Sequence, residues 1–155
     1  MELDVVQLTL ELIAHRSESL TSNVAVSRHI AGILERLGFE VEEVAYMNAN
    51  EVEKLCLVAR LGQGQGGLSL MGHSDTVPAR RADGWSGDPF TGRVRRGRLY
   101  GRGACDMKGP LAACLCAAAR FAGRELVAPL YIVVTADEEI QARGAREVVA
   151  RSPLF

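Results

Sequence analysis

The sequence predicts an α/β protein in which a mixed β-sheet is sandwiched by helices. Both ends of the chain carry apolar residues at helical spacing, and short apolar runs typical of strands lie between them. The predicted order is two helices, three strands, a helix, a strand and a helix, which suits a layered α/β architecture. With 155 residues, 48% of them apolar, the chain is long enough for one globular domain with its own core.

Two amphipathic helices are predicted at the N-terminal end. Residues 3–15 form the first, because apolar residues recur there every three or four positions. The second extends from about Asn23 to Leu37. Thr21 or Ser22 can serve as its N-cap, and Gly38 closes it, since glycine readily adopts the left-handed conformation that ends a helix.

Three strands are predicted after the second helix. Residues 39–44 alternate apolar and acidic side chains, as a half-exposed strand does, and residues 55–61 and 68–72 are the next two strands. The glycine-rich segment between the last two predicts a hairpin-like connection. Its glycines also match the G-x-G-x-x-G spacing of dinucleotide-binding proteins at Gly62, Gly64 and Gly67. Since a strand and not a helix follows them, we interpret the segment as a flexible turn.

A long irregular segment opens the second half of the chain. Residues 78–103 are rich in Gly, Pro, Asp and Arg, and apart from a short ribbon near 93–98 they predict a loop, which at this length is usually functional. A helix over 110–121, a buried parallel strand over 130–135 and a helix over 144–150 complete the fold. Cys114 and Cys116 lie two apart on the first of these helices, so they face different directions and are expected to be core thiols.

Composition and charge exclude several classes of function. A net charge of −1 gives no electrostatic reason to bind nucleic acid or an acidic membrane, and 5% aromatic residues do not suggest a base-stacking surface. The N-terminus lacks the continuous apolar core of a signal peptide, and no apolar run is long enough to span a bilayer. The cysteines show no CxxC pairing, which favours reduced thiols. We therefore expect a cytoplasmic protein.

Three short segments place acidic residues and a histidine where structure alone does not require them. In the first, His73 and Asp75 follow a strand that is expected to be buried, and they are two residues apart, so they can converge; a carboxylate commonly orients a metal-bound imidazole. In the second, Asp106 lies just before a helix, where it can either cap the helix or bind a metal. In the third, the carboxylates of residues 137–139 repel one another unless a cation or exposure to solvent relieves them.

Together the three segments predict a metal centre. In open α/β sheets, ligands bind outside the carboxyl ends of the strands, and His73, Asp106 and Glu139 belong to such ends or their loops. One nitrogen and several hard oxygens suit zinc or a related divalent ion, with positions left open for water and substrate. A bridging carboxylate would hold two ions roughly 3.5–4 Å apart, the spacing of two-metal hydrolases.

Four motifs occur in a specific order: Gly-His-Ser-Asp-Thr-Val-Pro at 72–78, Trp85 with Asp-Pro-Phe-Thr at 88–91, residues 99–109, and Thr-Ala-Asp-Glu-Glu at 135–139. This set resembles the di-zinc amidohydrolase family of acetylornithine deacetylase, succinyl-diaminopimelate desuccinylase, aminoacylase and a glutamate carboxypeptidase. The resemblance covers the chain from about the second helix onwards and implies a zinc aminopeptidase-like catalytic domain. The Asp-Pro-Phe-Thr run and Gly-Ala-Arg at 144–146 are most similar to acetylornithine deacetylase, with desuccinylases and related carboxypeptidases as alternatives.

The resemblance also implies a role for each matching residue. His73 would bind one zinc ion, Asp106 would bridge two, and Glu139 would bind the other; cobalt or manganese could replace zinc. Asp75 would orient and polarise the imidazole of His73. Glu138 would be the general base, taking a proton from the bridging water and passing it to the leaving amine. The implied substrate is a small N-acyl amino acid, most closely N2-acetylornithine.

By the same resemblance, two further metal ligands are needed downstream of Glu139, together with a lid domain through which family members form homodimers. After Glu139 the sequence offers Glu147 as its one acid and no histidine, while His15 and His29 suit ordinary roles in the N-terminal helices. We therefore expect residues 1–155 to be the N-terminal portion of a metallohydrolase catalytic domain, lacking the lid, and to be inactive alone. The competing hypothesis is a non-catalytic remnant that binds one metal weakly or none.

Overall fold

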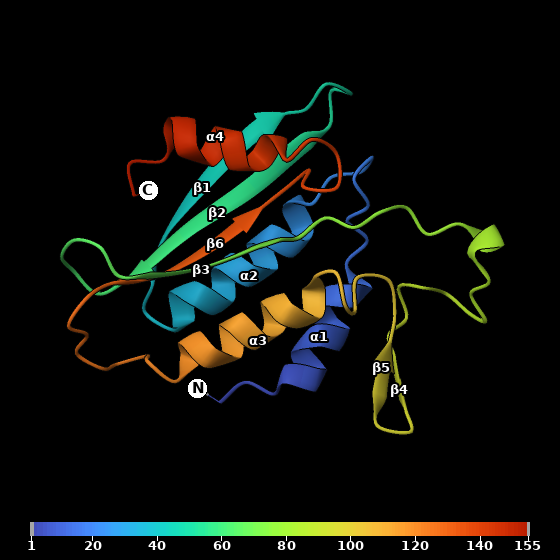
Figure 1. The fold of residues 1–155 in the computed structure, drawn as a ribbon, viewed down its shortest axis with the longest axis horizontal. Coiled ribbons are helices and arrows are strands. Elements are labelled where there is room, and N and C mark those ends of the chain that lie inside the picture. Colours follow the sequence, from blue (N-terminus) through green and yellow to red (C-terminus); the bar gives the residue numbers. More distant parts are fainter. Residues whose placement is uncertain (1, 155) are drawn as a thin grey trace.

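A computed structural model describes residues 2–154 and contains one mixed four-stranded sheet with helices on both faces, which confirms the expected fold class (Figure 1). The helices are α1 (Val5–Ala14), α2 (Val24–Arg36), α3 (Lys108–Ala119) and α4 (Arg143–Arg151), with a short 3₁₀ turn, η1 (Arg81–Asp83). The strands are β1 (Glu40–Met47), β2 (Glu53–Leu61), β3 (Leu68–His73), β4 (Arg93–Arg95), β5 (Arg98–Tyr100) and β6 (Leu130–Thr135). The main sheet has the order β1-β2-β6-β3, and β4 and β5 form a separate ribbon.

The expected hairpin between β2 and β3 is wrong. β6 lies between these strands, antiparallel to β2 and parallel to β3. The glycine-rich turn instead passes the start of β6, where Gly67 lies so close to Pro129 that a Cβ at position 67 would collide with the Pro129 carbonyl. The turn leads into a strand, so it lacks the helix N-terminus that dinucleotide binding requires, as the sequence indicates.

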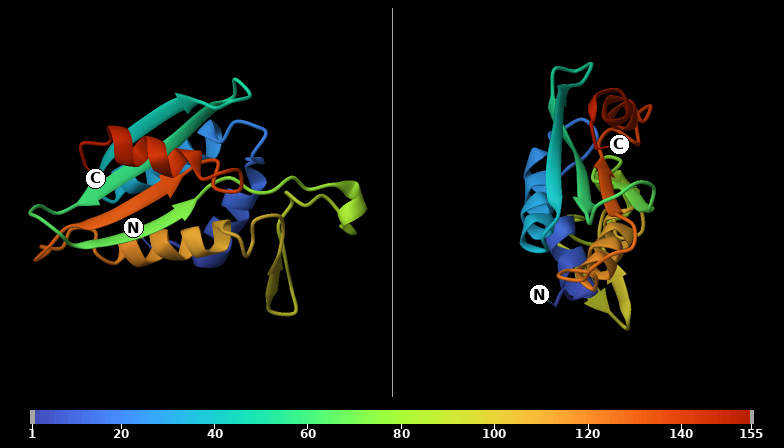
Figure 2. Two further views of the ribbon diagram at one scale, coloured as in Figure 1. Left: turned by 45° about the horizontal axis from the view of Figure 1, so that its top comes forward. Right: turned by 90° about the vertical axis from the view of Figure 1, so that its left-hand side faces the viewer.

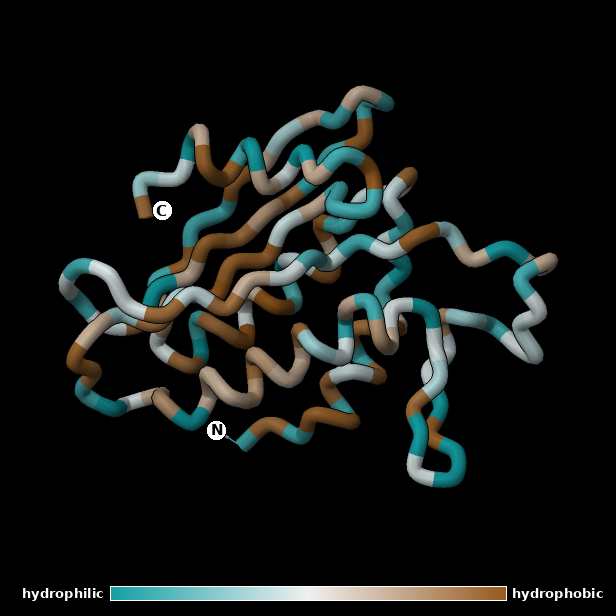
Figure 3. The backbone as a smooth tube through the Cα atoms, in the orientation of Figure 1, coloured by the Kyte–Doolittle hydropathy of each residue, from teal (hydrophilic) through white to brown (hydrophobic). Residues whose placement is uncertain are grey.

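Two hydrophobic cores lie on opposite faces of the sheet. β2 and β6 are the central strands and are buried on both faces, which explains their continuous apolar sequences. Alternate residues such as Leu57 and Ile132 pack against α1, α2 and α3, while Val58 and Val133 face α4. Figure 2 shows α4 on the far side of the sheet from α2, and Figure 3 shows the apolar central strands between them.

The start of α2 differs from the expected cap. The N-cap is Asn23, not Thr21 or Ser22. The Asn23 side chain binds the sheet: its Nδ2 donates to the Leu55 carbonyl at 2.8 Å and to Ser74 Oγ at 2.8 Å, and the Leu55 N–H donates to its Oδ1 at 2.9 Å. Asn23 therefore fixes α2 against β2 and against the residue that follows β3.

The start of α4 is pressed against the end of β6. The Gly144 N–H donates to the Ala136 carbonyl at 3.1 Å. A Cβ at position 144 would collide with the Ala136 backbone and with Cys56 Sγ, so only glycine allows this approach. The close contact brings the chain back over the sheet directly after residues 137–139.

The long segment after β3 projects from the body of the protein, as Figure 1 shows. It contains η1 and the β4–β5 ribbon, the latter close to the predicted position. Its base is held by the Asp-Pro-Phe motif: Arg16 pairs with Asp88 at 3.2 Å, and the Arg16 guanidinium lies 4.7 Å from the centre of the buried Phe90 ring. The motif thus anchors the loop to the residues after α1.

The two edge strands of the main sheet differ in character. β1 carries Glu40, Glu42 and Glu43, whereas β3 carries no charged residue apart from His73 at its end. Leu68 and Met71 of β3 are 59% and 50% exposed. β3 is therefore not the buried strand that the sequence suggests but a partly exposed, uncharged edge.

None of the helices in residues 2–154 combines the length and apolar character needed to cross a lipid bilayer. All four cysteines are free. Cys114 and Cys116 are partly buried on α3, and Cys116 packs against the larger core.

Candidate metal centre

The carboxyl ends of β3 and β6 lie next to each other and deliver most of the predicted site residues. The two strands are parallel, with His73 paired opposite Thr135, so the residues that follow each strand enter the same region. His73 ends β3, and Glu138 and Glu139 follow β6 within one turn of chain. Asp106 arrives separately, from the loop before α3.

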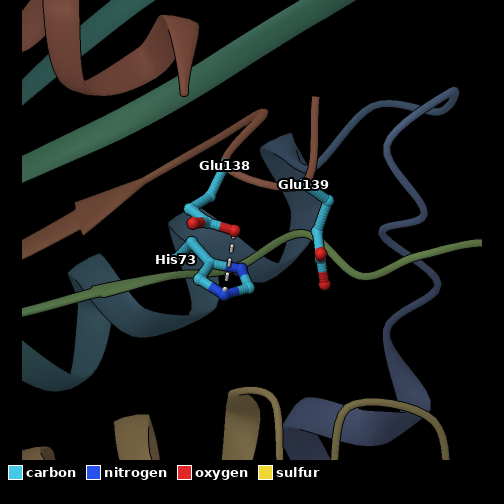
Figure 4. A group of neighbouring side chains, drawn as sticks. All are labelled: His73, Glu138 and Glu139. Carbon is cyan, nitrogen blue, oxygen red and sulfur yellow. Dashed lines mark ion pairs between the residues drawn. The ribbon is translucent and has the colours of Figure 1, made fainter. Parts of the chain in front are cut away.

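His73 is buried and held on both ring nitrogens. Its Nδ1 lies 2.9 Å from the Asp75 carbonyl oxygen and 3.5 Å from Asp75 Oδ1. Its Nε2 lies 3.1 Å from Asp106 Oδ1 and 3.7 Å from Glu138 Oε2, and Figure 4 shows the ring beneath the Glu138 carboxylate. One nitrogen is thus anchored, and the other faces two carboxylates.

Asp75 is fully buried and does more than orient the imidazole. Its Oδ1 accepts the Glu138 N–H at 3.2 Å, and its Oδ2 accepts the Glu139 N–H at 3.3 Å and the Ser19 hydroxyl at 3.2 Å. Burial alone would raise the pKa of Asp75, but His73 and the two backbone donors outweigh it and lower the pKa. Asp75 therefore stays ionised and joins both strand ends.

Asp106 reaches the site because it does not cap α3. The N-cap of that helix is Met107, which makes no side-chain capping bond. The Asp106–Met107 peptide bond is cis, and Gly109 brings the start of α3 so close to the Ala104 carbonyl that a Cβ there would collide with it. Of the two sequence interpretations of Asp106, the structure favours the site over the cap.

The remaining donors gather around His73. One donor atom from each of His73, Glu138 and Glu139 lies within 4.8 Å of the others. Burial raises the pKa of Glu139, and the charges of Asp106, Asp75 and Glu138 raise it further, although His73 opposes them. A divalent cation would relieve this repulsion, and one imidazole nitrogen with several carboxylate oxygens suits zinc, cobalt or manganese. The residues present fit a metal ion.

The sequence pattern groups Asp137 with the two glutamates that follow it and predicts no separate role for it. The structure separates it from them: Asp137 is buried and pairs with Lys54 at 2.8 Å. A signal exists in the sequence, because Lys54 opens the apolar run Leu55–Ala59, and a lysine at a buried strand position needs a partner. Among the described residues, His15 and His29 do not belong to the group of metal donors.

We expect the metal-free protein to lose stability as the pH rises from 6.5 to 8. Burial lowers the pKa of His73, but Asp75 and Asp106 outweigh it and raise the pKa from 6.5 to about 9. The folded state then holds a proton that the unfolded state has released, so the free energy of unfolding falls by up to about 2 kcal/mol over this interval.

Lys108 acts in the opposite direction, weakly below pH 8 and fully above it, because burial lowers its pKa to about 8. Urea denaturation in the presence of a chelator, at a series of pH values, measures the effect. His73→Gln serves as the control and should flatten the pH dependence. Stability that stays constant or increases between pH 6.5 and 8 would contradict the prediction.

The sequence of this chain is similar to a family model and to curated proteins. The sequence model of peptidase family M20/M25/M40 matches residues 69–154. Acetylornithine deacetylase of Proteus mirabilis is 41% identical over an aligned length of 155, and the match covers 96% of this chain and 39% of that protein. Succinyl-diaminopimelate desuccinylase of Xylella fastidiosa is 41% identical over 148 residues, covering 94% and 38%. The chain thus spans less than half the length of these curated relatives.

Solved structures give the same picture of the fold. Human carnosine dipeptidase 1 superposes with a TM-score of 0.83 at 30% identity, over 94% of this chain and 34% of that one. A dinuclear metal-binding peptidase of the M20 family from Bacillus subtilis has a TM-score of 0.61 at 18% identity, over 94% and 38%. At that identity the second likeness concerns the fold alone.

Proposed function

Because this chain belongs to peptidase family M20/M25/M40, we propose that it forms part of a metal-dependent hydrolase that cleaves the amide bond of an N-acyl amino acid. The observation that carries the proposal is the convergence of His73, Asp106, Glu138 and Glu139 outside the ends of β3 and β6. We take residues 1–155 as the N-terminal portion of the catalytic domain. The preferred substrate is N2-acetylornithine, which would give the enzyme a place in arginine biosynthesis.

In this proposal His73, Asp106 and Glu139 would hold two divalent ions, zinc for preference, together with donors from elsewhere in the whole protein. Bound ions of this kind polarise a carbonyl group and make water more acidic. Asp75 keeps the His73 ring in place through its bonds on the Nδ1 side. The same carboxylate holds the backbone of Glu138 and Glu139.

Glu138 is the proposed general base. Its side chain is about half exposed, with Oε2 3.7 Å from His73 Nε2, so it borders the proposed metal site while remaining open to substrate and water. It accepts a proton as water adds to the amide carbon, and it returns that proton to the nitrogen as the C–N bond breaks. The products are a carboxylic acid and a free amine, and the carboxylate of Glu138 is regenerated.

Two alternatives have support from particular relatives. The Xylella desuccinylase is as similar in sequence as the Proteus deacetylase, and the human carnosine dipeptidase shares the fold at 30% identity. By their names, one removes a succinyl group and the other cleaves a dipeptide, so each hydrolyses an amide bond, as the proposed deacetylase does. We further propose a cytoplasmic enzyme, a homodimer through a lid domain, acting on small molecules and not on nucleic acid or membranes.

A substrate panel tests the proposal. The whole natural polypeptide that contains residues 1–155, loaded with zinc, is expected to hydrolyse N2-acetylornithine with a higher kcat/KM than N-acetylcitrulline, N-succinyl-diaminopimelate or a dipeptide. A chelator should abolish hydrolysis, and zinc, cobalt or manganese should restore it. A higher kcat/KM on the succinylated substrate would replace the deacetylase by the desuccinylase. No metal-dependent hydrolysis of any of these amides would refute the proposed function.

Residues 1–155 by themselves are proposed to be inactive. They supply one imidazole and a few carboxylates to a site that would need to hold two ions. The competing hypothesis of a non-catalytic protein predicts the same inactivity for the whole natural polypeptide. The two hypotheses therefore differ in what the longer protein does.

A further inference from the structure

A buried lysine lies behind the candidate metal centre. Lys54 of β2 is fully buried, and its Nζ lies 2.8 Å from Asp137 Oδ1. The ammonium group also donates to the carbonyl oxygens of Ser19 at 2.8 Å and Thr21 at 2.7 Å, so it is surrounded by three oxygen atoms. Burying an ion pair gains little net stability, since desolvation offsets the attraction. Stability alone therefore does not account for the pair.

Asp137 forms the bend that carries the two glutamates. It has a φ of 55°, in the left-handed region, which is strained for most residues and tolerated by Asp. Its Oδ2 accepts the Tyr46 hydroxyl at 3.0 Å and Asn48 Nδ2 at 3.4 Å, while Lys54 binds Oδ1. The side chain is thus held from three directions in the conformation that reverses the chain.

The bend determines where Glu138 and Glu139 lie. Asp137 fixes the start of the segment, and Asp75 holds the next two backbone N–H groups at 3.2 and 3.3 Å. Ser19 links Asp75 to the Lys54–Asp137 pair, because its hydroxyl donates to Asp75 and its carbonyl accepts from Lys54. In Figure 4 the Glu138 side chain lies over His73, and the Glu139 side chain extends beside it.

Lys54 also offsets negative charge near the candidate metal centre. The region collects five carboxylates: Asp75, Asp106, Asp137, Glu138 and Glu139. In residues 2–154, the ion pairs of these acids involve two cations, His73 and Lys54. Because His73 must be neutral to bind a metal, Lys54 is the cation that can remain while a metal is bound.

We propose that Lys54 and Asp137 are a positioning pair, which fixes the bend after β6 so that the carboxylates of Glu138 and Glu139 face His73 before a metal ion arrives. The proposal rests on the proposed function, because it concerns the same metal site. Neither residue touches the reacting atoms. Their effect should therefore appear in metal affinity and not only in the stability of the fold.

The test compares Lys54→Met with the double variant Lys54→Met/Asp137→Asn in the whole natural polypeptide. The single variant leaves a buried carboxylate without its cation and is expected to be unstable. The double variant removes both charges, and Asn keeps the tolerance for positive φ, so its resistance to urea should be close to that of the wild type. Its affinity for Zn²⁺ should nevertheless be about 10–100-fold weaker, the range seen when groups supporting metal ligands are changed.

The matched control is Glu40→Gln/Arg60→Met, which removes an exposed ion pair of 2.6 Å between β1 and β2. Zinc affinity is measured by competition with a chromogenic chelator, and the control should match the wild type. A folded double variant that binds zinc as tightly as the wild type would overturn the proposal. It would show that Lys54 and Asp137 only neutralise each other's charge and do not position the glutamates. If the double variant does not fold, Tyr46→Phe, which removes one bond to Asp137, should weaken zinc binding several-fold; unchanged affinity there would also overturn it.

The outcomes separate this inference from the proposed function. A wild-type protein that binds zinc but hydrolyses none of the amides refutes the function and leaves the comparison of zinc affinities to decide the positioning pair. A wild-type protein that hydrolyses the amides, together with a double variant of unchanged affinity, refutes only the positioning pair. A wild-type protein that binds no zinc refutes both.

Discussion

Replacing Glu138 by Gln is expected to lower the turnover number of the whole enzyme by about 10²–10⁴-fold while its metal content stays the same. The amide is nearly isosteric with the carboxylate but does not accept a proton from the attacking water. The half-exposed position of Glu138, beside His73 but open to solvent, suits proton transfer. Activity on N2-acetylornithine and metal analysis of the same purified sample measure both quantities.

Glu139→Gln is the matched control, since it is expected to reduce metal content as well as activity. This control is needed because a carboxylate oxygen of Glu138 and one of Glu139 both lie within 4.8 Å of a His73 ring nitrogen. Loss of metal together with activity in Glu138→Gln would make Glu138 a metal ligand. Full activity in that variant would remove it from the chemistry.

A polypeptide limited to residues 1–155 is expected to bind zinc more than about 100-fold more weakly than the whole natural protein and to hydrolyse no amide. Changes in groups that merely support metal ligands cost roughly 10–100-fold in affinity, so a site without its full set of direct ligands should lose more. The raised pKa of Glu139 points the same way, because burial and, after it, the surrounding like charges disfavour the ionised carboxylate in the absence of a metal ion.

Calorimetric titration with zinc, followed by hydrolysis assays at saturating zinc, tests this expectation. The whole natural protein is the positive control. A short polypeptide that binds zinc tightly and hydrolyses N2-acetylornithine would contradict it and show that residues 73–139 hold a complete catalytic site. An inactive whole protein would instead favour the non-catalytic hypothesis.

Local sequence patterns predict the helices and strands of this fold well, but they predict poorly which strands lie side by side in the sheet. The continuous apolar run at Leu130–Thr135 identifies a buried parallel strand, and the structure has β6 there. The hairpin predicted between β2 and β3 is wrong, because β6 comes much later in the chain and inserts between them. Pairing between distant strands depends on how the apolar faces of the whole sheet and its helices are buried. A short stretch of sequence does not contain that information.

The same distinction applies to the candidate site. His73, Glu138 and Glu139 stand out in the sequence because they lie at strand ends, and Asp106 because it lies just before a helix; the structure brings the four together. The bonds from Asp75 to the backbone of Glu138 and Glu139 have no sequence pattern, since they join segments more than sixty residues apart. The partnership of Lys54 with Asp137 is likewise visible only once the strands are assembled.

The contrast between the two outer strands has a consequence for association. A strand edge with free N–H and C=O groups is a template on which another strand can be added, and acidic side chains discourage this. The glutamates protect β1, whereas β3 offers Leu68–Met71 without a charge. Any strand recruited to this sheet, from the same chain or another copy, should therefore join at β3. Because β3 ends at His73, the place where the sheet can grow adjoins the candidate metal centre.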